Sequence, residues 1–157
     1  FKVDDTYETF LDQRSIMPWF FKRRVDEGGY KISQDYTFHH QSESVETNKG
    51  KTFKIPMGTQ DMISAFYYAR TLNFKNASKG KTFSFPVFMD NEIFTLKIKY
   101  LGDQVISTDN KPYDFYVKRL AIVGMNATNC LSCRHCVCSN IIIDNNTTQI
   151  IAMTDFQ

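Results

Sequence analysis

The chain has 157 residues, a mass of 18.3 kDa, 42% hydrophobic and 23% charged residues, and a formal net charge of +2. The length predicts one domain, and these two shares are typical of a globular chain rather than a disordered one. The small net charge excludes the strongly basic surface of most nucleic-acid-binding proteins, so we expect no nucleic-acid partner. No apolar run approaches the roughly 18 to 20 residues that cross a bilayer as a helix, so we expect no transmembrane segment.

The residues before the helical segment are predicted to be mostly strands. Aromatic residues make up 15% of the chain, and this composition favours strands and an aromatic core. Residues 1–12 form the first predicted strand. Residues 19–38 form two more around Glu27-Gly28-Gly29, since glycine readily adopts the positive φ of tight hairpins. A turn at 48–50 leads to a short strand at 51–55.

Residues 60–73 change from strand alternation to a helical period. One face of the predicted helix collects apolar residues at spacings of three and one: Met62, Ala65, Phe66, Ala69 and Leu72. Thr59 is placed to cap this helix, and Asp61 falls in its first turn, near the positive end of the helix dipole. This is the one helix that we expect.

Three strands are predicted after the helix, over residues 82–90, 93–102 and 113–124. Pro86 lacks an amide hydrogen, so the first of them is predicted at a sheet edge or bulge. The second alternates cleanly, with an inward face and an outward face: Phe94, Leu96, Ile98 and Tyr100 against Thr95, Lys97 and Lys99. Successive strands joined by short turns predict a mainly β fold, a curved antiparallel sheet with one α-helix packed on it.

Three segments resemble a known family: RRVDEGGYKI (23–32), IPMGTQDMISAFYYARTL (55–72) and PVFMDNEIFTLKIKYLG (86–102). In their order and spacing they are similar to the bacterial domain of unknown function 3108, over about residues 1–120. The resemblance implies an exported protein of Gram-negative bacteria, periplasmic or in the outer envelope, that enters by a signal peptide. It also implies a half-barrel akin to those of lipoprotein carriers. The family has no established activity, so it supplies no catalytic residue.

Both ends of the chain depart from the pattern of this family. The chain opens on Phe1 without an initiator methionine, so we expect a processed or N-terminally truncated product. After residue 120 the expected acidic, Trp-containing strands are missing, and residues 121–157 carry only three charged residues and one aromatic, Arg134, Asp144, Asp155 and Phe156. We therefore predict a β-sheet domain over 1–120. Residues 121–157 are predicted to be an atypical tail that is not native to this fold, such as a divergent end, a recombined segment or a frameshifted product.

All four cysteines lie in NCLSCRHCVC, residues 129–138: Cys130, Cys133, Cys136 and Cys138. Structural zinc sites usually pair two Cys-x2-Cys knuckles across a loop, and the Cys-Pro that ends the ferredoxin pattern is missing. Free thiols, disulfides and metal thiolates all stay open for this spacing. Because the segment lies in the atypical tail, we predict no metal site and no cofactor. The run at 141–143 suggests a strand.

Two adjacent pairs resemble acid–base groups, but neither predicts catalysis. His39 and His40 follow an alternating strand, so their side chains point to opposite faces, and we interpret them as exposed strand-end residues. Asp26 and Glu27 lie in the glycine hairpin beside Arg23, which indicates a solvated turn. No nucleophile–base pair or phosphate-binding loop emerges, so we predict that the chain is not an enzyme.

The helix and the cleanest strand supply the predicted ligand site. If the helix covers the sheet, an apolar site would be lined by Phe66, Leu72, Phe94, Leu96 and Ile98. The first hypothesis is a non-catalytic module that binds an apolar or lipid-like ligand or an envelope protein partner. The alternative is a structural or interaction scaffold of the cell envelope, in which the same face is a solid core without a small ligand.

Overall fold

The computed structural model describes residues 4–106, 115–123, 140–144 and 150–154. The described residues form two antiparallel five-stranded sheets with one short α-helix and one 3-10 helix. The strand order is β1-β2-β3-β4-β5 in the first sheet and β10-β9-β8-β7-β6 in the second. The prediction of a mainly β, antiparallel fold with one α-helix is confirmed, and its strands divide between two sheets. The half-barrel curvature stays a prediction.

The strands predicted over 19–38, 51–55, 82–90 and 113–124 have closely similar bounds in the structure, whereas β7 extends four residues beyond the predicted 93–102, and β4 and β10 were not predicted. The strands of the first sheet are β1 (Thr6–Leu11), β2 (Pro18–Glu27), β3 (Tyr30–His39), β4 (Ser44–Thr47) and β5 (Thr52–Lys54). The 3-10 helix η1 (His40–Ser42) lies between β3 and β4. The helix and the second sheet follow as α1 (Ser64–Ala69), β6 (Thr82–Met89), β7 (Glu92–Ile106), β8 (Phe115–Val123), β9 (Asn140–Asp144) and β10 (Ile150–Thr154). The predicted turn at residues 109–112 lies outside the described residues.

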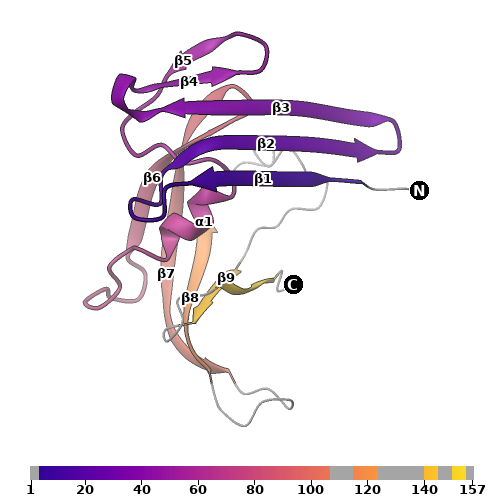
Figure 1. Cartoon of the computed structure of the whole chain (residues 1–157). Coiled ribbons are helices and arrows are strands. Elements are labelled where there is room, and N and C mark those ends of the chain that lie inside the picture. Colours follow the sequence, from indigo (N-terminus) through magenta and orange to yellow (C-terminus); the bar gives the residue numbers. More distant parts are fainter. Residues whose placement is uncertain (1–3, 107–114, 124–139, 145–149, 155–157) are drawn as a thin grey trace. The chain divides into compact units, whose positions relative to one another are not determined.

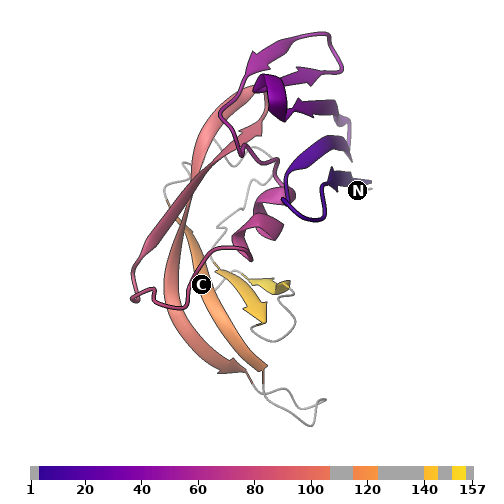
Figure 2. The same ribbon diagram turned by 60° about the vertical axis from the view of Figure 1, so that its left-hand side comes forward.

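The chain divides into two compact units. The first comprises Phe1–Tyr68 and Phe85–Thr95, and the second comprises Ala69–Ser84 and Leu96–Gln157. The division passes through β6 and β7, so each unit holds part of this hairpin. In the second unit, β8 pairs with both β7 and β9, and the three strands run side by side (Figure 2). The strand expected at residues 141–143 is confirmed as β9, whereas the assignment of residues 121–157 to a tail that is not native to the fold stays a prediction.

The β2–β3 hairpin forms where the glycines predict it. Glu27 pairs with Tyr30, and the two residues between them are Gly28, at φ 55°, and Gly29, at φ 103°. Both angles lie in the left-handed region, which glycine enters without steric cost. The hairpin joins the two longest strands of the first sheet (Figure 1).

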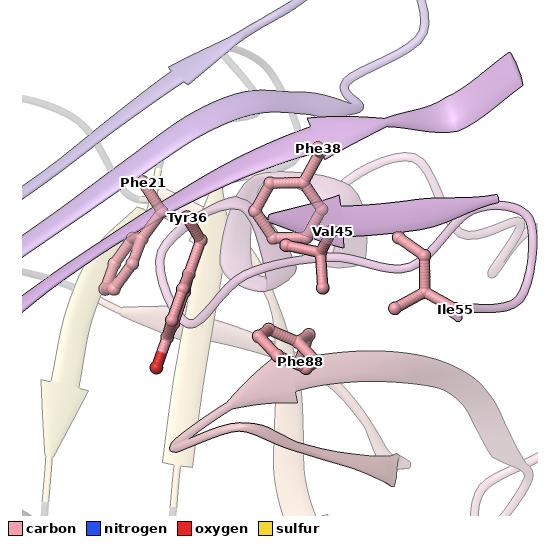
Figure 3. Packing of buried hydrophobic residues seen from close by; sticks show 6 residues of the cluster. All are labelled: Phe21, Tyr36, Phe38, Val45, Ile55 and Phe88. Carbon is pink, nitrogen blue, oxygen red and sulfur yellow. The ribbon is translucent and has the colours of Figure 1, made fainter. Parts of the chain in front are cut away.

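The core of the first unit is built on the apolar face of the first sheet. Its buried members are Phe21, Tyr36, Phe38, Val45, Ile55 and Phe88, which point toward one another in Figure 3. Phe88, from β6, meets the ring of Tyr36 edge-on at 4.9 Å between centroids and lies 5.4 Å from the ring of Phe53. Strand alternation brings Phe21, Tyr36, Phe38 and Val45 to one face of the first sheet, and Phe88 packs against that face from β6 of the other sheet.

The helix is shorter than predicted, because α1 covers residues 64–69 rather than 60–73. Gln60 pairs with the edge of β6 instead: its backbone N–H donates to the carbonyl of Pro86 at 3.0 Å, and Phe88 N–H donates to its carbonyl at 2.9 Å. A residue held in this extended bridge cannot belong to a helix, so the helix begins later. The prediction that Pro86 lies on an edge strand is confirmed.

The capping residue is Asp61, and the prediction of Thr59 is wrong. Asp61 Oδ1 accepts hydrogen bonds from the backbone N–H groups of Ile63 at 2.7 Å and Ser64 at 2.8 Å. The hydroxyl of Thr59 instead donates to the carbonyl of Pro56 at 2.6 Å. Asp61 Oδ2 accepts from Thr9 Oγ1 at 2.5 Å, which ties the start of α1 to β1, its neighbour in Figure 2.

Asp61→Asn is expected to remove a pH-dependent loss of stability. Burial raises the pKa of Asp61 above its ordinary value of 3.8, and the hydrogen bonds from Thr9, Ser64 and Ile63 oppose that shift. Because the folded-state pKa is raised, Asp61 makes its full contribution to the free energy of unfolding below pH 3.8. This contribution is lost as the pH rises through the folded-state pKa. The free energy of unfolding of the wild type, measured in urea, should therefore fall relative to Asp61→Asn over that rise.

The matched control is Asp61→Ala, which also removes the charge but cannot accept the two capping hydrogen bonds. It should be less stable than Asp61→Asn by about 0.5–2 kcal/mol at every pH. A difference between wild type and Asp61→Asn that stays constant across the pH range would contradict the assignment.

The second unit has an aromatic cluster and a bulge on β7. Phe74 lies 5.0 Å from Phe83 and 5.4 Å from Tyr100, measured between ring centroids. The register with β8 shifts between Tyr100 and Gly102, where a φ of 110° at Gly102 suits glycine. The predicted alternation of β7 is confirmed for Leu96, Ile98 and Tyr100, which are buried, and for the exposed residues between them.

Candidate functional site

The predicted apolar site draws on both units. Phe66 lies on α1 and Leu72 in the turn after it, and both are half-buried. Phe94, Leu96 and Ile98 lie on β7, where Phe94 is half-buried and the other two are 5% and 0% exposed. Phe66 and Phe94 belong to the first unit, and the other three belong to the second. Their grouping into one ligand site stays a prediction.

Both histidines of the pair were predicted to be exposed. His39 is exposed, but His40 is buried. His40 Nε2 lies 2.6 Å from the carbonyl oxygen of Pro18, and this nitrogen must carry the hydrogen because a carbonyl only accepts. The His40 ring also stacks on Phe38, at 6.0 Å between centroids. His40 continues the inward face of Tyr36 and Phe38, so the alternation of β3 extends into the 3-10 helix η1, and the expectation that both histidines are exposed is wrong for His40.

The acidic pair at the hairpin is a solvated turn, as predicted. Asp26 pairs with Lys31 at 2.9 Å, and both side chains are largely exposed. Neighbouring strands of the first sheet carry two similar ion pairs, Lys22–Glu8 at 2.7 Å and Arg24–Asp35 at 2.6 Å. Exposed pairs of this kind contribute only about 0–1 kcal/mol each and carry no chemistry.

A buried arginine is the most unusual feature of the first unit. Arg23 is 0% exposed, and on the inward face of β2 it stands between Phe21 and Val25. Its Nη1 lies 3.2 Å from Asp90 Oδ1, in an ion pair whose carboxylate side chain is 20% exposed. Gln34 joins the pair: its Nε2 donates to the same carboxylate oxygen at 2.9 Å, and its Oε1 accepts from Arg23 Nη1 at 3.4 Å.

Two local structures bring these side chains together. Arg23 and Gln34 are direct partners in the β2–β3 register, so their side chains share one face of the sheet. Asp90 and Asn91 form the two-residue turn between β6 and β7, with φ values of 52° and 65°. Aspartate and asparagine tolerate these left-handed angles better than most residues, and a turn of this type matches the twist of the strands. This turn therefore positions the Asp90 carboxylate beside the Arg23 guanidinium.

Several buried polar atoms of this group have no hydrogen-bond partner among the described residues. They are Arg23 Nε and Nη2, Asp90 Oδ2 and the hydroxyl of Tyr36. Burial, together with the charge of Asp90, raises the pKa of Tyr36 to about 12, so its hydroxyl keeps the proton at neutral pH. The guanidinium also lies 5.6 Å from the centroid of the Tyr7 ring. We define Arg23, Gln34, Tyr36 and Asp90 as the Arg23 cluster.

The Arg23 cluster was not predicted, since Arg23 was expected beside a solvated turn. One signal was available: Phe21, Arg23 and Val25 alternate along β2, so an arginine interrupts an apolar face. Arginine is almost never fully buried unless it is paired, so an arginine at this position predicts a nearby acidic partner.

The described part of the chain has no group of three or more His, Cys, Asp or Glu side chains that could hold a metal ion. Cys130, Cys133, Cys136 and Cys138 lie outside the described residues. Among the helices in the described ranges, none is long and apolar enough to cross a membrane.

Comparison with known proteins yields one match. No curated protein and no solved structure matches the chain. Residues 1–123 match a family described as "Protein of unknown function (DUF3108)", and this match confirms the resemblance expected over residues 1–120. The matched region contains the whole Arg23 cluster and every residue of the predicted apolar site. The chain therefore belongs to the DUF3108 family.

Proposed function

We propose that the chain is a non-catalytic, exported protein of the cell envelope that binds an apolar or lipid-like ligand. The export and envelope location rest on the resemblance in residues 23–32, 55–72 and 86–102. The non-catalytic character is supported by the uses of two buried polar groups, since Asp61 caps the start of α1 and His40 bonds to a backbone carbonyl.

The observation that carries the proposal is the partial exposure of bulky apolar side chains at the predicted site. Phe66, Leu72 and Phe94 are half-buried, so each has apolar surface that a ligand can still cover. Leu96 and Ile98 are already buried, which makes them supporting positions rather than contact positions. Within this proposal, Phe66 and Phe94, which both belong to the first unit, are the contacts to test.

Phe94→Ala and Phe66→Ala are each expected to weaken the binding of a fluorescent long-chain fatty acid. Loss of one partly covered ring removes about 1–2 kcal/mol of apolar contact, which corresponds to roughly a 5- to 30-fold higher Kd. The measurement is a fluorescence titration of each folded variant against the wild type.

The matched control is Ile93→Ala, which truncates an apolar side chain that is 44% exposed and precedes Phe94 on β7. It should leave the Kd within about twofold, since neighbouring strand residues face opposite sides. If the wild type binds no apolar probe, the proposal fails and the scaffold alternative, with a solid core on the same face, takes its place.

A further inference from the structure

The Arg23 guanidinium uses only one of its two edges in hydrogen bonds to the described residues. A guanidinium has two usable edges, and here the Nη1 hydrogens serve Asp90 and Gln34. Nε and Nη2 share the other edge, and neither has a hydrogen-bond partner among the described residues. Two parallel N–H groups on one edge match the two oxygens of a carboxylate.

Leaving this edge empty would be costly. Arg23 is 0% exposed, and its neighbours on the same face of β2 are the apolar residues Phe21 and Val25. A buried donor without an acceptor costs about 1–3 kcal/mol, and more when the group is charged. An acceptor on this edge would therefore stabilise the first unit.

We propose that the Nε–Nη2 edge of Arg23 binds the carboxylate of an organic acid. The acid is either a small free one or the head group of a longer apolar chain. The site belongs to the first unit alone and does not depend on the proposed apolar site, so either can fail without the other.

The charges of the Arg23 cluster favour a monoanion over a dianion, because a carboxylate adds one negative charge to the neutral Arg23–Asp90 pair and a phosphate dianion adds two. Asp90 already balances the guanidinium through the opposite edge, so a phosphate dianion would leave two uncompensated charges in a buried place. Tyr36 adds a buried hydroxyl that lies near the backbone N–H groups of Asp90 and Asn91, and it keeps its proton at neutral pH. It can donate to a carboxylate that is held near the cluster.

The direct test follows the Nε–H resonance of Arg23 in the wild-type protein by ¹H–¹⁵N NMR. Titration with sodium acetate, with sodium chloride as the ionic-strength control, should shift this resonance downfield and saturably. Arg23→Lys removes the resonance and identifies it, and in calorimetry this variant should bind acetate at least about tenfold more weakly, because it loses the two-point contact. Arg24→Lys is the matched control, since Arg24 is partly exposed and already pairs with Asp35. It should leave acetate binding unchanged.

Further probes separate the two sources of the carboxylate. Equal binding of acetate and decanoate indicates a small acid, while much tighter binding of decanoate, with none of decanol, indicates the head group of an apolar acid. Stronger binding of inorganic phosphate than of acetate would overturn the choice of carboxylate. The proposal would be overturned if no acid shifts the Arg23 Nε–H resonance and this resonance shows a cross-peak to water. Water would then occupy the Nε–Nη2 edge. The wild-type titration decides this even if Arg23→Lys does not fold.

Discussion

Phe88→Ala is expected to lower the free energy of unfolding by about 3–5 kcal/mol. Phe88 is 1% exposed, and its ring meets three aromatic rings of the core: Tyr36 at 4.9 Å, Phe53 at 5.4 Å and Phe38 at 6.5 Å between centroids. Truncation removes these contacts and leaves a cavity that the surrounding strands cannot fill fully. Urea unfolding followed by circular dichroism measures the loss.

The matched control is Phe10→Ala, the same chemical change on β1 at a side chain that is 57% exposed. Within the described part of the chain the ring of Phe10 lies beside that of Phe20 alone, at 6.0 Å between centroids, so its truncation should cost less than about 1 kcal/mol. Equal losses for the two variants would show that Phe88 does not occupy the core of the first unit.

The parts of the fold that the sequence predicts are those that depend on local chemistry. Strict alternation over residues 94–100 correctly identifies the buried and exposed faces of β7. The hairpin follows from Gly28 and Gly29, whose positive φ values lie between β2 and β3. Pro86 indicates an edge because a missing amide hydrogen excludes a central position. Each inference requires only neighbours within a few residues.

The length of the helix could not be predicted in the same way. The apolar spacing over residues 62–72 fits a helical face, but Gln60 pairs with β6 through two backbone hydrogen bonds. This pairing joins residues 26 to 28 positions apart, and nothing in the helical pattern reveals it. Asp61 then caps the turn that remains. A tertiary contact has overridden the local preference.

The candidate site is less accessible to sequence reasoning than the fold. The pattern of β2 places Arg23 on an apolar face, but its partner Asp90 is 67 residues away. The turn that follows β6 belongs to the other sheet, and only tertiary packing brings it to the arginine. His40 shows the same limitation, because the carbonyl of Pro18 that holds its ring is 22 residues away. Buried polar groups are recognised by their partners, and these partners are distant in the chain.

Arg23→Met is expected to destabilise the chain by about 3–5 kcal/mol, and Asp90→Asn by a similar amount. Each change leaves the other member of the ion pair without its opposite charge, and Arg23 is fully buried. The double variant leaves no unpaired charge, so its loss should be smaller than the sum of the single losses by about 1–3 kcal/mol. Urea unfolding in chloride buffer without carboxylates measures all three variants.

Arg24→Met and Asp35→Asn form the matched cycle, because they remove a neighbouring ion pair with side chains that are 38% and 24% exposed. Its coupling energy should stay below about 1 kcal/mol, since water already screens both charges. The exposed pair has the better geometry, with two contacts at 2.6 and 3.0 Å against one at 3.2 Å for Arg23–Asp90, so a larger coupling energy in the Arg23 cycle would come from its apolar surroundings. Losses in the Arg23 cycle that add within about 0.5 kcal/mol would mean that the pair is not coupled. The guanidinium would then be held chiefly by the Tyr7 ring and Gln34, and the turn at Asp90 would have no part in placing its free edge.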